Sequence, residues 1–314
     1  MRLAHGTTEF LLVLVPGFSQ LCLSSFIDPL RYANRLSGWE RFRWKLISED
    51  GAPVECSSGI RVCVDASLDK EANFLKSSNL PYGIALFAGV GVEHYQSAPL
   101  ISLLRFYARH NITLYGFGTG AWILAAAGLL LDARCTIHWD MMAAFSESFD
   151  DLELADALFV EQRKIVTCAG EFAAFDLAIS IVEKCCGLDL AQSVCRFVIA
   201  NRRRDGESRQ SVPHGLRFGC GSEKLICVIR VMENSLENPL SLSAISLLEG
   251  ISCRQIQRLF LHHLQAKPMR YYLLLRLIRA RQLIESTNMT MLEVAIACGF
   301  IWPAARPSTH GCTS

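Results

Sequence analysis

The sequence has no apolar run long enough to cross a membrane and no Cys-x-x-Cys pair. Its longest apolar stretch, residues 121–131, falls well short of the roughly 20 residues that a bilayer-spanning helix needs. The apolar run at residues 10–15 meets Pro16 and Gly17 at once, so it is too short for the core of a signal peptide. We therefore expect no membrane span and a cytoplasmic location.

Charge is also scarce: Asp, Glu, Lys and Arg make up 19% of the 314 residues, and hydrophobic residues make up 51%. This composition excludes a disordered chain, and the length fits two domains of roughly 100–200 residues each. The 13 cysteines are odd in number and lack metal-binding spacing, which favours reduced, mostly buried thiols. We expect no metal site, no cofactor and no disulfide framework.

The two halves of the chain differ in the sign of their charge. Residues 1–195 carry 15 Lys and Arg against 22 Asp and Glu, whereas residues 196–314 carry 16 against 8. A basic second half is typical of a surface that faces a polyanion such as nucleic acid. Two domains whose charge differs by chance are the alternative.

In the first half, short apolar runs alternate with segments of helical periodicity. This alternation predicts an α/β domain with a flavodoxin-like, mostly parallel sheet and helices on both faces. In such sheets, ligands bind beyond the carboxyl ends of the strands, where Gly17, Gly89 and Gly118 would lie. The expected strands are 10–15, 43–48, 84–88 and 112–117, and the expected helices are 19–36, 98–109, 118–131, 172–186 and 189–200.

A segment rich in Arg, Gly and Ser at residues 201–223 has almost no apolar periodicity, and we place the domain boundary there. Everything after it has helical periodicity, so the second domain is expected to be all-α. The expected domains are 8–195, a linker at 196–223, 224–300, and an atypical tail at 301–314. The expected helices of the second domain are 224–234, 241–249, 253–264, 269–286 and 290–298.

Residues 242–260 have the spacing of a helix-turn-helix. Ile245 and Leu248 are apolar on the first helix, Gly250 allows a positive φ in the turn, and Ser252 can cap the second helix. Arg and Gln suit bidentate contacts to base edges in the major groove. An ordinary helical hairpin with a solvated polar face explains the spacing equally well. The second helix would bury Ile256, Leu259 and Phe260 and expose Cys253, Arg254, Gln255, Gln257 and Arg258.

A longer set of residues carries a family resemblance. It comprises Pro239-Leu240-Ser241-Leu242, Ser252-x-Arg254-x-Ile256-x-Arg258-Leu259-Phe260, Pro268-x-x-Tyr271, Arg276-Leu277-x-x-Ala280-Arg281-x-Leu283-Ile284 and Glu293-Val294-Ala295-x-Ala297-Cys298-Gly299-Phe300. With these residues, the stretch 236–300 resembles the DNA-binding domain of the AraC/XylS family of transcription regulators. The resemblance implies two helix-turn-helix units joined by a long helix, and promoter DNA as the partner. The DNA contacts would come from Ser252, Arg254, Gln255, Gln257 and Arg258.

The chain departs from this family after Phe300. Pro303 and Pro307 lie four residues apart and cannot both sit inside one regular helix. We therefore expect the second helix-turn-helix to lack its recognition helix, as in a truncated or frameshifted gene. DNA binding would be weakened, and Val294, Ile296 and Phe300 would lose packing partners.

Residues 8–190 resemble the PfpI-like, class I glutamine amidotransferase-like domain. The matching residues are Pro16-Gly17-Phe18, Asp28-Pro29-Leu30-Arg31-x-Ala33-Asn34, Ser48-Glu49-Asp50-Gly51, Ser58-Gly59, Gly116-x-Gly118-Thr119-Gly120-Ala121, Ala127-Gly128-Leu129-Leu130, His138-Trp139 and Thr167-Cys168-Ala169-Gly170 with Asp176. In enzymes of this superfamily a Cys occupies the sharp turn between strand and helix, where the helix dipole favours the thiolate.

Here Gly118 stands at that turn, so no catalytic residue is expected. His138 falls where a catalytic His is often found and Asp28 near the acidic partner, but neither works without a nucleophile. Cys135 and Cys168 lie too far along the chain to be assumed substitutes. The rival interpretation is a PfpI-like hydrolase or amidase with a decayed tail, and a third is a non-functional truncated regulator.

The two domains together resemble GlxA-type regulators of the AraC/XylS family. This resemblance implies a catalytically inactive domain that senses a small amine or amino-acid-like ligand such as glycine betaine, carnitine or arginine. Asp28 would attract a cation and Trp139 would stack on it; the alternatives are a surface ion pair of Asp28 with Arg31 and core packing of Trp139. We expect a homodimer, with RNA polymerase as a further candidate partner. The expected ligand-binding residues are Phe18, Asp28, Gly118, Thr119, His138 and Trp139.

Overall fold

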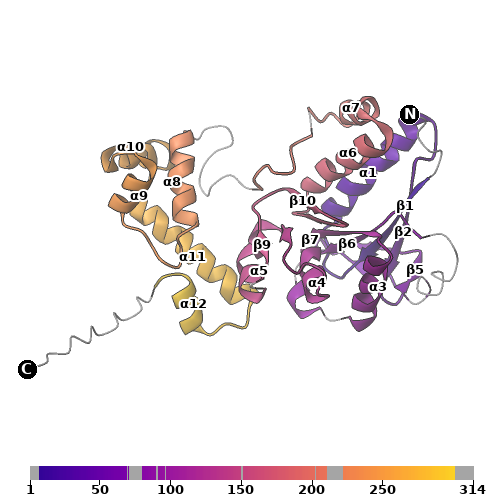
Figure 1. Ribbon diagram of the computed structural model, residues 1–314, viewed down its shortest axis with the longest axis horizontal. Helices are drawn as coiled ribbons and strands as arrows, with labels where there is room; N and C mark the ends of the chain where they lie inside the picture. The colour runs from indigo at the N-terminus through magenta and orange to yellow at the C-terminus, as the bar shows by residue number, and fades with distance from the viewer. Residues whose placement is uncertain are drawn as a thin grey trace, which may run out of the picture. The chain divides into compact units, whose positions relative to one another are not determined.

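The structure is a computed structural model that describes residues 7–68, 70, 80–89, 91–95, 97–149, 151–201, 203–210 and 222–300 (Figure 1). The chain divides into two compact units, residues 1–211 and residues 212–314. Within the described ranges, no helix is both long and apolar enough to cross a membrane.

The first unit is built on a sheet with the strand order β10-β11-β7-β6-β1-β2-β5. Neighbouring strands are parallel except for the antiparallel pair β10 and β11, which confirms the expected mostly parallel sheet. Parallel order brings the carboxyl ends of β1, β6, β7 and β11 to one edge of the sheet. The strands are β1 (Thr8–Leu14), β2 (Phe42–Ser48), β5 (Ala66–Ser67), β6 (Gly83–Ala88), β7 (Thr113–Gly118), β10 (Phe159–Gln162) and β11 (Ile165–Cys168).

Helices cover both faces of this sheet, as expected. Phe10 and Leu12 of β1 pack into a core with α1, α6 and α7, whereas Leu11 and Val13 pack into a second core with α3, α4 and α5. A strand buried on both faces has no polar side to alternate with, which explains the continuous apolar run. The helices are α1 (Gln20–Ser37), α3 (Ala98–Arg109), α4 (Gly120–Ala126), α5 (Met142–Ser148), α6 (Ala173–Cys186) and α7 (Leu188–Phe197).

Helix α4 is shorter than expected, because it ends at Ala126 instead of running on to Leu131. Gly128 follows with a φ of +70°, a backbone conformation that stops a right-handed helix. Besides β5, β10, β11 and α5, the sequence did not reveal several short elements before and after α4. They are β3 (Val54–Glu55) paired with β4 (Arg61–Val62), β8 (Arg134–Cys135) paired with β9 (Glu153–Leu154), and the 3-10 turns η1 (Val92–His94) and η2 (Trp139–Met141).

The structure differs from the expected linker at 196–223. Helix α7 runs to Phe197, and residues 203–210, which we call the strap, dock on the first unit. The backbone N–H groups of Leu158 and Phe159 donate to the carbonyl oxygens of Ser208 and Gly206, at 3.0 and 3.2 Å. The Arg-, Gly- and Ser-rich composition of this segment, without apolar periodicity, indicated a linker. In the structure its backbone carbonyls accept hydrogen bonds from the N–H groups of Leu158 and Phe159 at the edge of the sheet. Residues 211–221 lie outside the described residues.

The second unit is all-α, as expected, and each of its helices agrees with the sequence prediction to within one residue at either end. Its core joins α8, α9, α10 and α11 through completely buried side chains such as Val228, Ile245 and Phe260. Residues 301–314 lie outside the described residues, so the expected break at Pro303 and Pro307 stays a prediction. The helices are α8 (Glu223–Glu233), α9 (Leu242–Glu249), α10 (Cys253–Leu264), α11 (Pro268–Ser286) and α12 (Met291–Ala297).

Candidate functional site

A sharp turn, residues 118–120, joins β7 to α4, and we call it the elbow. Gly118 has a φ of +64°, and a Cβ there would stand 2.8 Å from the carbonyl oxygen of Ala88. Thr119 is buried and donates its hydroxyl to the carbonyl oxygen of Gly89 at 2.8 Å. The strand-to-helix turn expected from the sequence is therefore present, with no side chain at its apex.

Two other segments converge on the elbow. The backbone N–H of His138 donates to the carbonyl oxygen of Gly118 at 3.1 Å. Gly170, which follows β11, lies so close that a Cβ on it would stand 2.8 Å from the Cα of Gly118. The residue after it, Glu171, accepts a hydrogen bond at 2.8 Å from the hydroxyl of Ser19, which also caps α1. The elbow, His138, Ser19 and Glu171 thus form one cluster at the carboxyl edge of the sheet.

His138 is largely desolvated, and this burial lowers its pKa despite the opposing charges of Asp140 and Glu171. The imidazole is therefore neutral at pH 7, and its Nδ1 accepts a hydrogen bond at 3.4 Å from the backbone N–H of Asp140. The ring centroid of Trp139 lies 5.5 Å from that of His138, and Trp139 is 46% exposed. Core packing does not explain Trp139, so it stays a candidate for stacking on a ligand.

The sequence analysis missed two residues of this cluster, Ser19 and Glu171, and Glu171 is the charged one. It is half-buried, and its φ of +48° is uncommon for a residue with a side chain. Among the described residues, no Lys or Arg forms an ion pair with it. The one available signal was its position directly after Gly170, at the end of a strand that runs parallel to β7.

Phe18 and Asp28 do not join the cluster through their side chains. Phe18 is completely buried in the core. Asp28 forms an ion pair with Arg31 at 2.9 Å, with both side chains 48% exposed. It lies nine residues beyond the cap Ser19, which places it about 13 Å along α1 from the elbow edge. The surface ion pair, given above as the alternative for Asp28, is what the structure shows.

The two cysteines considered as substitute nucleophiles are poorly suited to that role. Burial raises the pKa of Cys135 to about 11 and that of Cys168 to about 12. Both are completely buried thiols at pH 7, and the thiolate is the nucleophilic form.

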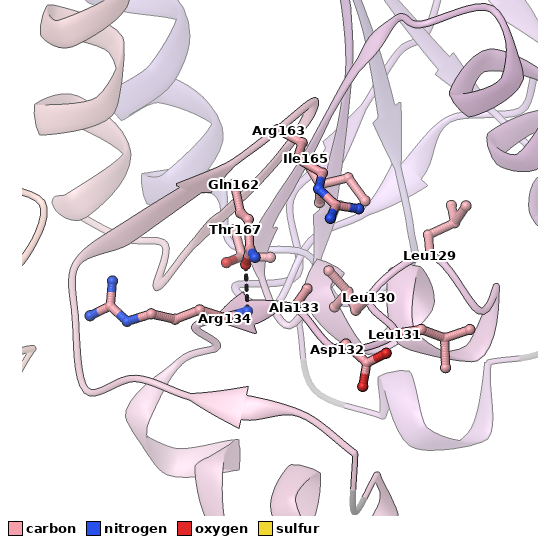
Figure 2. A pocket seen from close by; sticks show the side chains of 10 residues that line it. All are labelled: Leu129, Leu130, Leu131, Asp132, Ala133, Arg134, Gln162, Arg163, Ile165 and Thr167. Carbon is pink, nitrogen blue, oxygen red and sulfur yellow. Dashed lines mark hydrogen bonds between the residues drawn. The ribbon is translucent and has the colours of Figure 1, made fainter.

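A small cavity lies away from the elbow, between the segment after α4 and the β10–β11 hairpin (Figure 2). Its volume of about 80 Å³ is small against the roughly 300–1,000 Å³ of ligand pockets. The side-chain oxygen of Gln162 accepts the backbone N–H of Arg134 across it. It includes none of the expected ligand-binding residues. The cavity is lined by Leu129, Leu130, Leu131, Asp132, Ala133, Arg134, Gln162, Arg163, Ile165 and Thr167.

In the second unit, α9 and α10 form the expected helix-turn-helix. Gly250 has a φ of +63° in the turn, and the hydroxyl of Ser252 accepts the backbone N–H of Gln255 at 3.3 Å. Ile256 and Phe260 are completely buried as expected, whereas Leu259, also expected to be buried, is only half-buried. On the outer face Arg254, Gln257 and Arg258 are exposed, while Cys253 and Gln255 are half-buried.

One residue of α11, Arg276, holds the end of α12. Nε and Nη2 of Arg276 donate to the carbonyl oxygens of Cys298 and Gly299 at 2.8 and 2.6 Å. The guanidinium carbon lies 4.3 Å from the ring centroid of Phe300. Val294 is buried, contrary to the expected loss of its packing partner, whereas Ile296 and Phe300 are 47% and 40% exposed.

Both units match known families. Residues 10–184 match the DJ-1/PfpI family and residues 247–304 match the helix-turn-helix domain family. The DJ-1/PfpI match covers more than half of the chain, and the chain belongs to that family. The fold and the helix-turn-helix together define a DNA-binding transcription regulator with a DJ-1/PfpI sensing domain.

Two relatives from Pseudomonas aeruginosa extend this likeness along the chain. The HTH-type transcriptional regulator GbdR is 35% identical over 92% of this chain and 77% of its own length. The HTH-type transcriptional regulator CdhR is 36% identical over 94% of this chain and 86% of its own. These likenesses confirm the regulator predicted from the sequence and do not favour the hydrolase or amidase alternative.

Among solved structures, an AraC family transcriptional regulator from Pseudomonas putida is similar to this chain. Its TM-score is 0.54 at 27% identity, covering 61% of this chain and 99% of that one. The expected α/β fold of the first unit is thereby confirmed.

Proposed function

We propose that this regulator binds a small cationic ligand at the elbow without turning it over, and that α10 reads promoter DNA. One observation carries the ligand half of the proposal: a glycine occupies the apex of the elbow, and the residue after the adjoining Gly170 is Glu171, whose carboxylate acts on the pKa of His138. Among the described residues that carboxylate has no basic partner. A neutral His138 does not compete as its counter-ion, and the exposed Trp139 offers a face to a cation.

The absence of turnover rests on chemistry. Covalent catalysis at such an elbow needs a thiol or hydroxyl at the apex, and Gly118 has no side chain. Cys135 and Cys168 are held as thiols by burial. The elbow is then left with hydrogen-bonding and charged groups that bind a ligand, and it has no nucleophile at its apex.

The ligand proposal is tested by calorimetry with glycine betaine, carnitine and arginine as probes, on the wild type and two charge-neutralising variants. Glu171→Gln keeps the acceptor for Ser19 and removes the charge, so the affinity for the probe that binds should fall about tenfold or more. Asp28→Asn removes a charge from the exposed face of α1 and should leave that affinity unchanged. If only Asp28→Asn lowered the ligand affinity, Asp28 rather than Glu171 would be the anionic residue that binds the ligand, as the sequence predicted. Equal affinity in all three proteins would refute a carboxylate anchor.

The DNA contacts of Ser252, Arg254, Gln255, Gln257 and Arg258 are proposed on position and exposure. In fluorescence anisotropy on the chain's own promoter duplex, Arg254→Ala and Arg258→Ala should each weaken binding by about 1–3 kcal/mol where the residue reads a base. An arginine that contacts only phosphate should instead reduce the salt slope by about 0.9. Arg230→Ala removes one exposed charge from α8 and serves as the matched control. Equal losses in all three variants would mean that α10 has no special role.

The assembly state is part of the same proposal. Operators of helix-turn-helix proteins are commonly bound by dimers whose half-sites lie one helical turn apart. We expect a homodimer in the cytoplasm, with RNA polymerase as a further partner at the promoter. Sedimentation of the full chain alone and with its duplex separates a monomer from a dimer.

A further inference from the structure

The strap lies along β10, the outermost strand on one side of the sheet, and one of its contacts is linked to the elbow. Strand β10 is the last strand of the sheet on that side, and an edge strand leaves a row of backbone groups without partners. The carbonyl oxygens of Gly206 and Ser208 accept the N–H groups of Phe159 and Leu158 there. A Cβ on Gly206 would stand 2.7 Å from the ring of Phe159, so the strap lies directly on that ring.

One end of the strap is firmly anchored. The buried carboxylate of Asp176 on α6 accepts the backbone N–H of Arg204 at 2.6 Å and its Nε at 2.8 Å. Removing Arg204 would leave the desolvated carboxylate of Asp176 without its charged partner. This contact therefore fixes the start of the strap.

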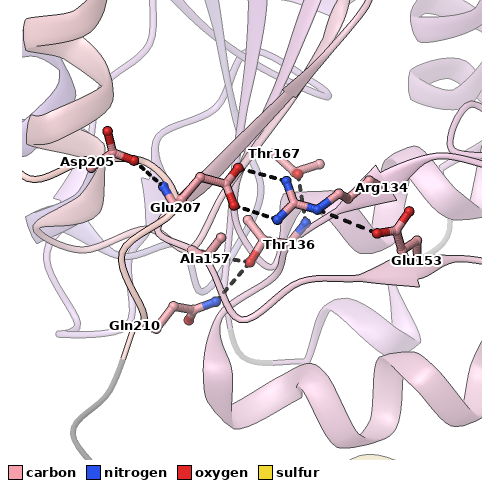
Figure 3. Close-up of polar contacts among 8 residues, drawn as sticks. All are labelled: Arg134, Thr136, Glu153, Ala157, Thr167, Asp205, Glu207 and Gln210. Atoms are coloured by element: carbon pink, nitrogen blue, oxygen red, sulfur yellow. Dashed lines mark hydrogen bonds and ion pairs between the residues drawn. The ribbon is translucent and has the colours of Figure 1, made fainter. Parts of the chain in front are cut away.

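The rest of the strap is held at Glu207, Arg209 and Gln210. Glu207 makes a two-pronged contact with Arg134 (Figure 3), but its side chain is 62% exposed, and such pairs contribute little net stability. At the far end, Nε2 of Gln210 donates to Thr136 Oγ1 at 2.9 Å and to the carbonyl oxygen of Ile137 at 2.8 Å. Its Oε1 is buried with no hydrogen-bond partner among the described residues, which weakens the side-chain contact. The carboxylate of Asp156 also holds this end, because it accepts hydrogen bonds from Nε of Arg209 and the backbone N–H of Gln210.

The contact of Gln210 leads directly to the elbow. The carbonyl of Ile137 and the N–H of His138 belong to one peptide unit. Gln210 binds the carbonyl side of this unit, and the carbonyl oxygen of Gly118 binds its N–H side. Any rotation of this rigid, planar unit disturbs both hydrogen bonds at once.

We propose that the peptide unit between Ile137 and His138 couples the elbow to the strap. A ligand that shifts His138 or Gly118 then changes how firmly Gln210 is docked. Lifting the strap as far as Arg204 frees the chain that leads from the first unit into the second. This inference rests on the proposed sensing function, since it describes how occupancy of the elbow would reach the DNA-binding unit.

The coupling is tested without ligand or DNA by amide hydrogen exchange in the full chain. Exchange is resolved to single residues and normalised to the amide of Leu86 in the central strand β6. Gln210→Leu keeps bulk and removes the hydrogen bonds, so exchange should rise about fivefold at the Leu158, Phe159 and His138 amides. This is the factor that loss of about 1 kcal/mol produces. Glu207→Gln is the matched control, which should loosen Leu158 and Phe159 but leave His138 unchanged. Equal behaviour of His138 in the two variants would overturn the proposal.

The opposite direction is tested from the elbow, because a true coupling is reciprocal. Gly118→Ala and Gly128→Ala each add a methyl group at a glycine of positive φ, but only Gly118 holds the N–H of His138. Gly118→Ala should raise exchange at Leu158 and Phe159 severalfold, and Gly128→Ala should not. The same response to both substitutions would contradict a path through His138. If the chain does not bind its promoter, the proposed DNA-binding function is refuted. The exchange measurements would still test whether the elbow and the strap are coupled.

Discussion

The carbonyl oxygen of Ala88 lies 2.8 Å from the point where a Cβ at Gly118 would stand. The elbow is therefore closed to side chains by a neighbouring strand as well as by its own φ of +64°. A shift of the β6 end would have to accompany any side chain placed there.

This relationship predicts a stability difference between two glycines of similar backbone conformation. Gly128→Ala meets nothing within 4 Å, so it should cost only the left-handed strain of about 1–2 kcal/mol. Gly118→Ala meets Ala88 as well and should cost about 1–3 kcal/mol more. Urea denaturation of both variants measures the difference. Equal losses would mean that the β6 end yields without cost.

The sequence predicted β1, β2, β6, β7 and most of the helices because their signals are local, but it missed β5, β10, β11 and α5. The continuous apolar run at residues 10–15 and the spacing of Ile256 and Phe260 each lie within one element. The residues around the elbow are different, since Glu171 reaches it only because β11 lies parallel beside β7. That pairing joins residues about 50 positions apart, such as Cys168 and Phe117, and leaves no trace in a local pattern.

The same limit explains Asp28 and the strap. Helical periodicity places Asp28 on α1 but does not show that its distance along the helix takes it away from the elbow. The strap has the composition of a linker, and its partners Asp176 and Arg134 lie far away in the sequence. Ion pairs and edge-strand hydrogen bonds with residues far away in the sequence leave no periodic pattern in the local sequence.

The lowered pKa of His138 predicts how its contribution to stability changes with pH. Because burial lowers the folded pKa below the ordinary value of about 6.5, the unfolded chain takes up the proton first as the pH falls. The stability that neutral His138 contributes is therefore present above pH 6.5 and is lost as the pH falls through the folded pKa. Chemical denaturation between pH 5 and 8 should show a steeper loss for the wild type than for His138→Gln. Parallel curves would mean that His138 titrates alike in both states.

The contact between Arg204 and Asp176 predicts a strong energetic coupling. Arg204→Ala leaves the buried carboxylate without its guanidinium, and the expected loss is up to about 3 kcal/mol. This is the low end for broken buried pairs, because the side chain of Arg204 is 46% exposed and solvent screens it. Asp176→Asn removes the charge, so Arg204→Ala should cost much less in that background. A double-mutant cycle by urea denaturation measures the coupling, and additive losses would contradict it.

In the second unit, the contacts of Arg276 predict how much this side chain contributes to holding α12. Its guanidinium fork donates to two carbonyl oxygens at the end of α12 and lies over the ring of Phe300, which one ammonium group cannot reproduce. Arg276→Ala should therefore lower the stability of the α12 contact by about 2 kcal/mol, and Arg276→Lys should recover only a minor part of it. Amide exchange at Val294 and Cys298 measures this loosening, since both N–H groups bond within α12 or its cap. Full recovery by Lys would show that charge alone, rather than the planar fork, holds the helix. No change in either variant would mean that the buried side chains of Val294 and Cys298 hold α12 by themselves.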